Sequence, residues 1–145
     1  MIRISKLADY GTLIMSYLAS APRQAHNARD IATHTHIALP TVSKLLKLLA
    51  NNGLLLSQRG VKGGYTLALP AEQISMAKII DALDGSIALT ECSHGAGLCA
   101  VEQYCTIRHN WRSISSIVHE ILIKVTLAEM LKPLAVTGGT DYGNT

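Results

Sequence analysis

The chain has 145 residues, of which 48% are hydrophobic and only 16% charged, which excludes a disordered chain and leaves room for about one domain. Aromatic residues make up 4%, too few for the stacking surfaces that bind single-stranded nucleic acid. The net charge of +3 is unevenly spread: residues 1–70 carry eight basic and two acidic side chains, and residues 71–145 carry five basic and eight acidic ones. The first half therefore suits a polyanion, and the low charged share favours an oligomer that covers apolar surface.

The first predicted element is an amphipathic helix near the N-terminus. A signal peptide is a poor alternative because Asp9 and Gly11 interrupt the apolar stretch. No stretch reaches the roughly eighteen apolar residues that a membrane span needs, so we expect a cytoplasmic protein with no membrane partner. The apolar residues that recur at helical spacing are Leu7, Tyr10, Ile14, Tyr17 and Leu18.

Two further helices are predicted between residues 27 and 51. Asn27 can cap a short helix that runs to about His34, and Pro40 takes the favoured first position of a third helix. One face of the third helix is apolar and is predicted to join the core, at Val42, Leu45, Leu46 and Leu49. The opposite face suits DNA, although a polar face is more often simply solvated. It carries Pro40, Thr41, Ser43, Lys44 and Lys47.

A β-hairpin is predicted next, with strands over 54–56 and 65–69 around a glycine-rich loop. Arg59, Lys62 and Gly63 in this loop suit contacts with a DNA backbone, and the alternative is an ordinary glycine turn with solvated cations. Three helices followed by a basic hairpin are the order of a winged helix-turn-helix. We therefore predict a mainly α protein whose residues 1–70 form a DNA-binding domain with a small β-hairpin wing, its third helix lying in the major groove.

The second half divides into four predicted segments. A linking helix lies within 71–90, a cysteine loop spans 91–109, a long helix spans 110–133, and a flexible tail covers 134–145. Apolar residues of the long helix alternate at spacings of three and four, which is typical of a two-helix coil. We predict that this helix forms a homodimer through Trp111, Ile114, Val118, Ile121, Val125 and Ala128.

Three cysteines, Cys92, Cys99 and Cys105, form the chemical signal of the sequence. Their odd number does not suit a disulfide framework and fits a reducing compartment. Thiolates are soft ligands, and the gaps are wider than those of structural zinc sites, so an iron–sulfur cluster is favoured. The alternatives are zinc or another metal, and free or redox-sensing thiols. An enzyme that uses these thiols is not expected, since no phosphate loop or Ser/His/Asp order indicates a small-molecule substrate.

Five features occur in one order at compatible distances: the opening segment 1–10, residues 39–44, the loop 59–65, the three cysteines and Trp111. Together they resemble the Rrf-two family of winged-helix transcriptional regulators (IscR- and NsrR-like) over about residues 1–132. Within this family the sequence is most similar to the proteobacterial regulators of the SUF iron–sulfur assembly system. The resemblance implies a homodimeric repressor of cluster assembly genes that senses an iron–sulfur cluster, with 2Fe-2S favoured over 4Fe-4S. The alternative within the family is a repressor that senses nitric oxide or redox state.

The resemblance also implies roles for individual residues. Cys92, Cys99 and Cys105 match the cluster cysteines of the family. IscR-like members place a histidine ligand three residues after the third cysteine, where this chain has Arg108, followed by His109. Nitric-oxide-sensing members use an aspartate of the first helix across the dimer, and Asp9 lies at the matching position. We therefore rank Asp9 above His109 as the fourth ligand, with His94 and Glu91 behind them. The alternatives are a solvated carboxylate for Asp9 and a histidine at a helix start for His109. A two-fold dimer further predicts a near-palindromic operator on double-stranded DNA.

Overall fold

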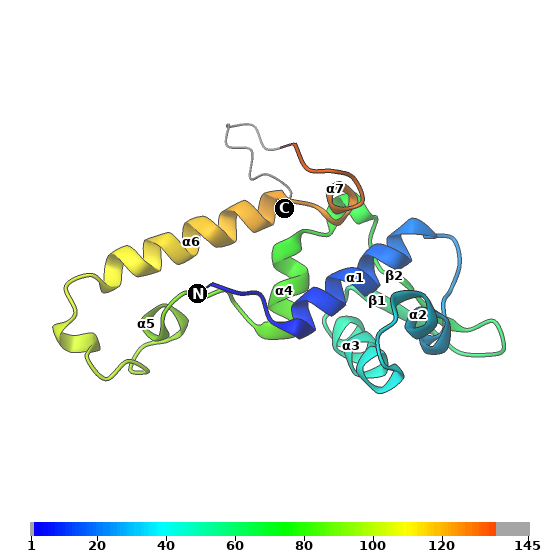
Figure 1. Cartoon of the computed structure of the whole chain (residues 1–145), viewed down its shortest axis with the longest axis horizontal. Coiled ribbons are helices and arrows are strands. Elements are labelled where there is room, and N and C mark those ends of the chain that lie inside the picture. The colour runs from blue at the N-terminus through cyan, green and yellow to red at the C-terminus, as the bar shows by residue number, and fades with distance from the viewer. Residues whose placement is uncertain (1, 136–145) are drawn as a thin grey trace.

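The computed structural model describes residues 2–135, which form a head (residues 2–84 and 125–135) and a projecting arm (residues 85–124) (Figure 1). In the head, α1 (Lys6–Ser20) begins where the hydroxyl of Ser5 accepts a hydrogen bond from the amide of Ala8. The apolar residues predicted for this helix are buried or packed against the core, which confirms the predicted amphipathic helix.

The next two helices form the predicted helix-turn-helix. α2 (Ala28–Thr35) begins at Asn27, whose side chain accepts a hydrogen bond from the amide of Asp30 at 2.9 Å. It ends at His36, whose left-handed backbone (φ 57°) turns the chain into α3 (Leu39–Asn51). Pro40 lies in the first turn of α3, where its missing N–H costs no hydrogen bond.

The wing consists of two antiparallel strands, β1 (Leu55–Gln58) and β2 (Gly64–Leu67), with Leu55 opposite Leu67. The predicted strands are therefore present, with bounds shifted by one or two residues. Tyr65 also exchanges two backbone hydrogen bonds with His26, of 2.8 and 3.1 Å. These bonds fix the wing against the segment that precedes α2.

The remaining helices connect head and arm. After the 3-10 turn η1 (Ala71–Gln73), α4 (Met76–Asp84) lies within the range predicted for the linking helix and packs on α1 and α3. The hydroxyl of Ser75 caps it by accepting a hydrogen bond from the amide of Lys78. The arm contains α5 (Glu91–His94), the 3-10 turn η2 (Glu102–Tyr104) and α6 (Arg108–Lys124). Figure 1 shows α6 running outward from the head, with α5 and the loop near its far end.

The prediction of a single long helix over 110–133 is wrong. α6 ends at Lys124, Val125 is extended, and a separate helix α7 (Leu127–Met130) begins at Thr126. Thr126 and Glu129 form a capping box, which favours a new helix start over continuation. The chain here pairs with the start of α4: the Met76 amide donates to the Val125 carbonyl and the Leu127 amide to the Ile74 carbonyl, both at 2.8 Å.

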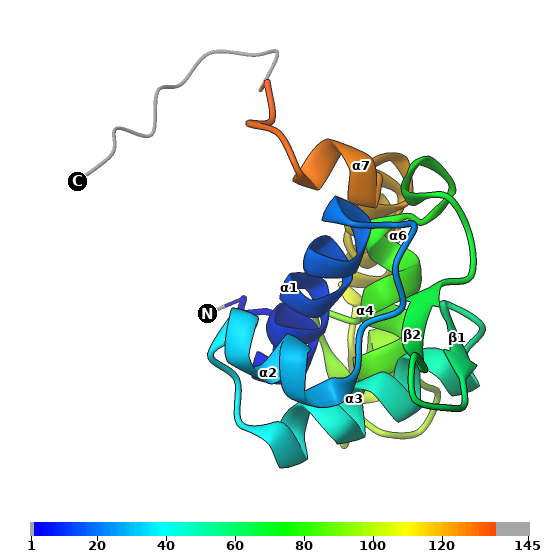
Figure 2. The same cartoon turned by 90° about the vertical axis from the view of Figure 1, so that its right-hand side faces the viewer.

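This break removes two residues from the predicted dimer helix. Val125 packs against the core of the head. Ala128 lies on α7, which packs on α1, as Figure 2 shows from the head side. Residues 136–145 of the predicted tail lie outside the described residues. Among the helices of residues 2–135, none has the length and apolar content needed to cross a membrane.

Candidate nucleic-acid interface and cysteine loop

The α3 helix has one buried and one exposed face, as predicted. Val42, Leu45, Leu46 and Leu49 are completely buried in the head. On the other face the side chains of Pro40, Lys44 and Lys47 are exposed, and Thr41 and Ser43 are half-buried. Because the apolar face holds the helix rigidly on the core, its cations and hydroxyls project from a fixed platform.

The wing lies beside one end of α3, through contacts between α3 and β1 (Figure 2). Arg59 and Lys62 are exposed at its tip. Gly63 has a different part: its amide donates to the Gly60 carbonyl at 3.0 Å, and a Cβ there would collide with the backbone of Gln58 and Arg59. Gly63 therefore closes the turn, and the two cations are the groups of the tip that can reach a phosphate.

The cysteines lie on a single loop of the arm, and all three are free thiols. Cys92, on α5, is buried, and its Sγ lies 3.2 Å from Oγ1 of Thr90. Cys99 and Cys105 are half-buried. Within residues 2–135, no three His, Cys, Asp or Glu side chains are grouped closely enough to hold one metal ion. The structure thus places the thiols in one segment without bringing them together.

The two candidates for a fourth ligand lie far apart in the fold. Asp9 is exposed in the first turn of α1, on the head, and within the described chain its carboxylate makes no ion pair. His109 is exposed at the start of α6, on the arm. Arg108 precedes His109, and its Nη1 lies 3.7 Å from Oε1 of Glu102.

Glu102, which is not among the predicted site residues, is one of three polar or charged residues that are buried in the described chain. A carboxylate is rarely buried unless it is paired, and Glu102 contacts two arginines and a backbone amide. The available signal in the sequence is a pair of arginines, Arg108 and Arg112, that follow Glu102 by six and ten residues at the predicted start of the long helix.

The α6 helix is held on one side and open on another. The Leu89 amide donates to the buried hydroxyl of Ser115 at 3.1 Å, and Nε2 of His119 lies 3.0 Å from Oδ2 of Asp81 on α4. Of the predicted dimer residues on α6, Val118 is half-buried and the others are exposed, as are two further isoleucines. The exposed apolar residues of α6 are Trp111, Ile114, Ile117, Ile121 and Ile123.

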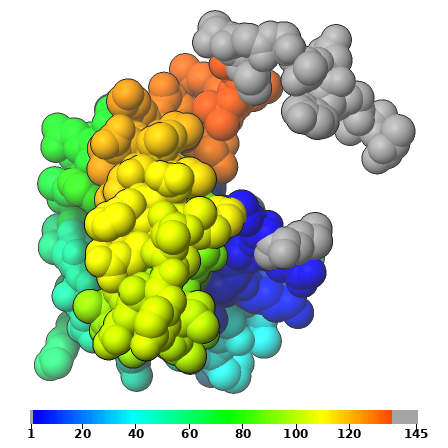
Figure 3. All heavy atoms as spheres, turned by 90° about the vertical axis from the view of Figure 1, so that its left-hand side faces the viewer, coloured from blue at the N-terminus to red at the C-terminus, as the bar shows by residue number. Residues whose placement is uncertain are grey.

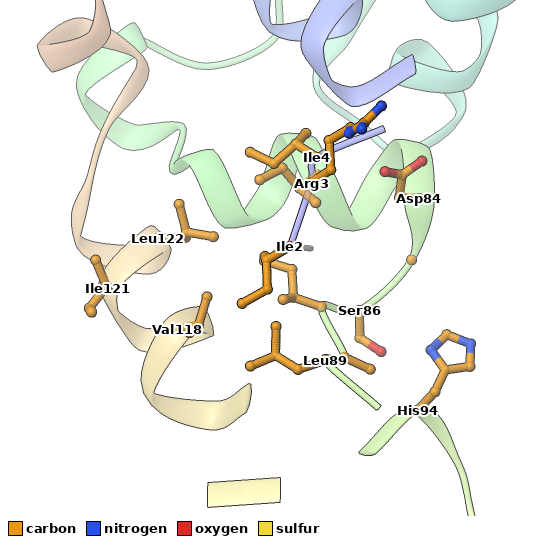
Figure 4. Close-up of a pocket in the computed structure, with 14 residues that line it drawn as sticks. Ile2, Arg3, Ile4, Asp84, Ser86, Leu89, His94, Val118, Ile121 and Leu122 are labelled. Carbon is orange, nitrogen blue, oxygen red and sulfur yellow. The ribbon is translucent and has the colours of Figure 1, made fainter. Parts of the chain in front are cut away.

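A cavity of about 580 Å³ lies between the N-terminal segment, the end of α4, residues 85–89 and α6. In Figure 4 the side chains of Val118 and Leu122 on α6 face Ile2 and Leu89 across it. Figure 3 shows the N-terminal segment beside the arm on this side of the molecule. The lining is mostly apolar and continues into the exposed face of α6 through Val118 and Ile121, which suits packing rather than chemistry.

Known proteins share this arrangement. A model of the family described as iron-dependent transcriptional regulators (Rrf2) matches residues 4–133. The HTH-type transcriptional regulator IscR of Vibrio atlanticus is 35% identical over 129 residues, which cover 80% of this chain and 74% of that protein. IscR of Cronobacter sakazakii is 34% identical over 112 residues, which cover 77% of this chain and 68% of that protein.

Solved structures agree with these matches. CymR, the global cysteine regulator of B. subtilis, superposes with a TM-score of 0.72 at 29% identity, over 90% of this chain and 97% of that one. IscR of T. potens gives a TM-score of 0.71 at 27% identity, over 90% and 86% of the two chains. These relatives are transcriptional regulators and not enzymes. With the exposed face of α3 and its basic wing, the chain is a DNA-binding transcriptional regulator that belongs to the Rrf2 family.

Proposed function

We propose that this regulator represses iron–sulfur cluster assembly genes and senses a 2Fe-2S cluster on its cysteine loop. The observation that carries the proposal is the donor set: three free thiols within one segment, at the positions expected from the family. Three thiolates fit a cluster chemically, and the irregular backbone that follows α5 would allow Cys99 and Cys105 to approach Cys92. Cys92, Cys99 and Cys105 would hold the cluster, which when bound would supply sensitivity to iron supply and to oxidants.

Asp9 of the partner subunit is the preferred fourth ligand in this proposal. The position that IscR-like members give to a histidine is held here by Arg108, which is paired with Glu102 and has no lone pair to offer. Asp9 is exposed and carries an oxygen ligand. His109 remains the alternative, because it is exposed at the edge of the same loop.

The proposed active form is a homodimer joined through α6. The exposed apolar residues along this helix would be buried by the same face of a second copy, packed antiparallel or crossed. Two-fold symmetry would present two α3 helices to a near-palindromic operator, with half-sites about one helical turn apart. Lys44, Lys47, Arg59 and Lys62 would contact phosphates, whereas Thr41 and Ser43 would face base edges.

The path from loop to DNA-binding surface runs through α6. α5 packs on α6, and α6 is joined to α4 of the head by the contact between His119 and Asp81. A change in the loop would therefore be transmitted through α6 to α4, which packs on α3. Coupling of this kind typically changes DNA affinity by about 1 to 3 kcal/mol.

The test begins with protein purified without oxygen. We expect visible absorbance with near-equal iron and sulfide, and its loss when Cys92, Cys99 and Cys105 are replaced by serine. Bound zinc without visible absorbance would show that the thiols hold a zinc ion and not a cluster. No metal at all, together with a DNA affinity that depends on thiol oxidation, would favour a redox sensor.

The second part of the test measures DNA binding by the same protein with and without its cluster. A salt-dependent gel shift on duplex DNA is expected, with an affinity that differs between the two forms. Equal affinities for the operator would contradict the sensing role, and no shift of duplex DNA at any salt concentration would contradict the regulator itself.

A further inference from the structure

Glu102 lies at the centre of a polar network that connects the cysteine loop to α6. It is only 8% exposed and sits between Cys99 and Cys105 in the sequence. Its Oε1 accepts a hydrogen bond from Nη2 of Arg112 at 3.0 Å, and its Oε2 accepts one from the amide of Gly97 at 2.6 Å. Both carboxylate oxygens are thus used, as burial of a charge requires.

Arg112 completes the network from the second turn of α6. While one end of its guanidinium binds Glu102, its Nε donates to the carbonyl of Cys92 at 2.8 Å. A single side chain therefore joins the first cysteine to a carboxylate that lies between the other two. A lysine could not make both contacts at once, because it lacks the planar fork of donors.

From these contacts we infer that Glu102 and Arg112 are positioning residues that keep the cysteine loop seated on α6 whether or not a cluster is bound. This inference deepens the proposed function and rests on it for the cluster. The thiols make none of these contacts, so the network persists when the cysteines have no ligand. It limits how far the backbone at Cys92 and at Gly97 can move from Glu102, and so favours uptake and slows release of the cluster.

The direct test is hydrogen exchange of the Gly97 amide in the cluster-free protein. Glu102→Ala and Arg112→Lys are expected to speed its exchange about tenfold or more, because a hydrogen bond to a charged group is lost or weakened. Glu102→Gln keeps an acceptor oxygen and should give a smaller increase. The amide of Leu89, bonded to Ser115 elsewhere in the arm, is the internal control and should not change.

The second readout is the rate at which an iron chelator removes the cluster, followed by visible absorbance. Glu102→Ala and Arg112→Lys should release it several-fold faster, with the rate partly restored in Glu102→Gln. The matched control is Glu120→Gln, since Glu120 is exposed on α6 and makes no ion pair within the described residues.

The outcomes separate this inference from the proposed function. Unchanged Gly97 exchange in both Glu102→Ala and Arg112→Lys, or release at the rate of the unaltered protein, would overturn the inference. If the unaltered protein takes up no cluster, the proposed function fails, and Gly97 exchange still decides whether the network holds the loop.

Discussion

The head and the arm of this molecule differ in the kind of side chain that each one buries. Among residues 2–135, the large side chains that are fully buried all belong to the head, and all of them are apolar. The buried residues of the arm are Cys92, Glu102 and Ser115: a thiol, a carboxylate and a hydroxyl. The head therefore has a core of its own, whereas the arm buries mainly polar groups and exposes most of the apolar side chains of α6.

The largest expected effect comes from removing a core residue of the head. Leu46 is completely buried, so Leu46→Ala should lower the free energy of unfolding by about 3 kcal/mol through lost burial and a cavity. Leu98→Ala, at an exposed leucine of the arm, should change it by less than about 0.5 kcal/mol. Chemical denaturation measures the free energy of unfolding of both variants, and equal losses would contradict the contrast between the head and the arm.

A charge on the open face of α6 should act on assembly. Ile114→Asp is expected to weaken self-association about 30-fold, or about 2 kcal/mol, because a carboxylate would have to be desolvated in an apolar interface. Sedimentation equilibrium gives the dissociation constant. Val61→Asp is the matched control, since Val61 is fully exposed on the wing. Dimers of equal strength in both variants would place the interface elsewhere.

The polar fastening of the arm can be tested at Ser115. Ser115→Ala leaves the Leu89 amide without its acceptor and should cost about 1 kcal/mol in chemical denaturation. Ser116→Ala is the natural control, because the neighbouring serine is exposed and makes no side-chain hydrogen bond in the described chain. A loss as large in Ser116→Ala as in Ser115→Ala would show that this contact does not hold the arm.

The smallest effect is expected at the DNA-binding surface of the head. Lys47→Ala should weaken binding to all duplexes and reduce the slope of log affinity against log salt by about one, as expected for one lost phosphate contact. Lys124→Ala, at the end of α6, should leave the slope unchanged. Ser43→Ala should affect only some operator sequences, and an equal loss on every sequence would remove Ser43 from base reading.

Sequence patterns predicted the head well because its helices pack on their own domain. The spacing of Leu7, Ile14 and Leu18 reports burial against α1's neighbours, and Asn27 and Ser75 satisfy helix starts locally. Such signals depend on a few adjacent residues. They therefore survive without any knowledge of the tertiary structure.

The arm was predicted less well, for two physical reasons. The apolar spacing of α6 continues through Val125 and Ala128, although α6 ends at Lys124 and a new helix begins at Thr126. The capping box formed by Thr126 and Glu129 was the sequence signal of this new start. The network of Glu102 depends on contacts between a loop and a helix, for which a sequence has no periodicity. The DNA-contacting, ligand and dimer residues remain predictions.

The pairing of residues 74–76 with 125–127 has a consequence for motion. Because the arm leaves the head after Asp84, at the end of α4, and returns to pair with the residues at the start of α4, its two ends are fixed at opposite ends of one helix. The arm cannot rotate about a single strand, as a tethered appendage would. A displacement of α6 therefore acts on α4 at two points, and α4 packs on α3 of the DNA-binding surface.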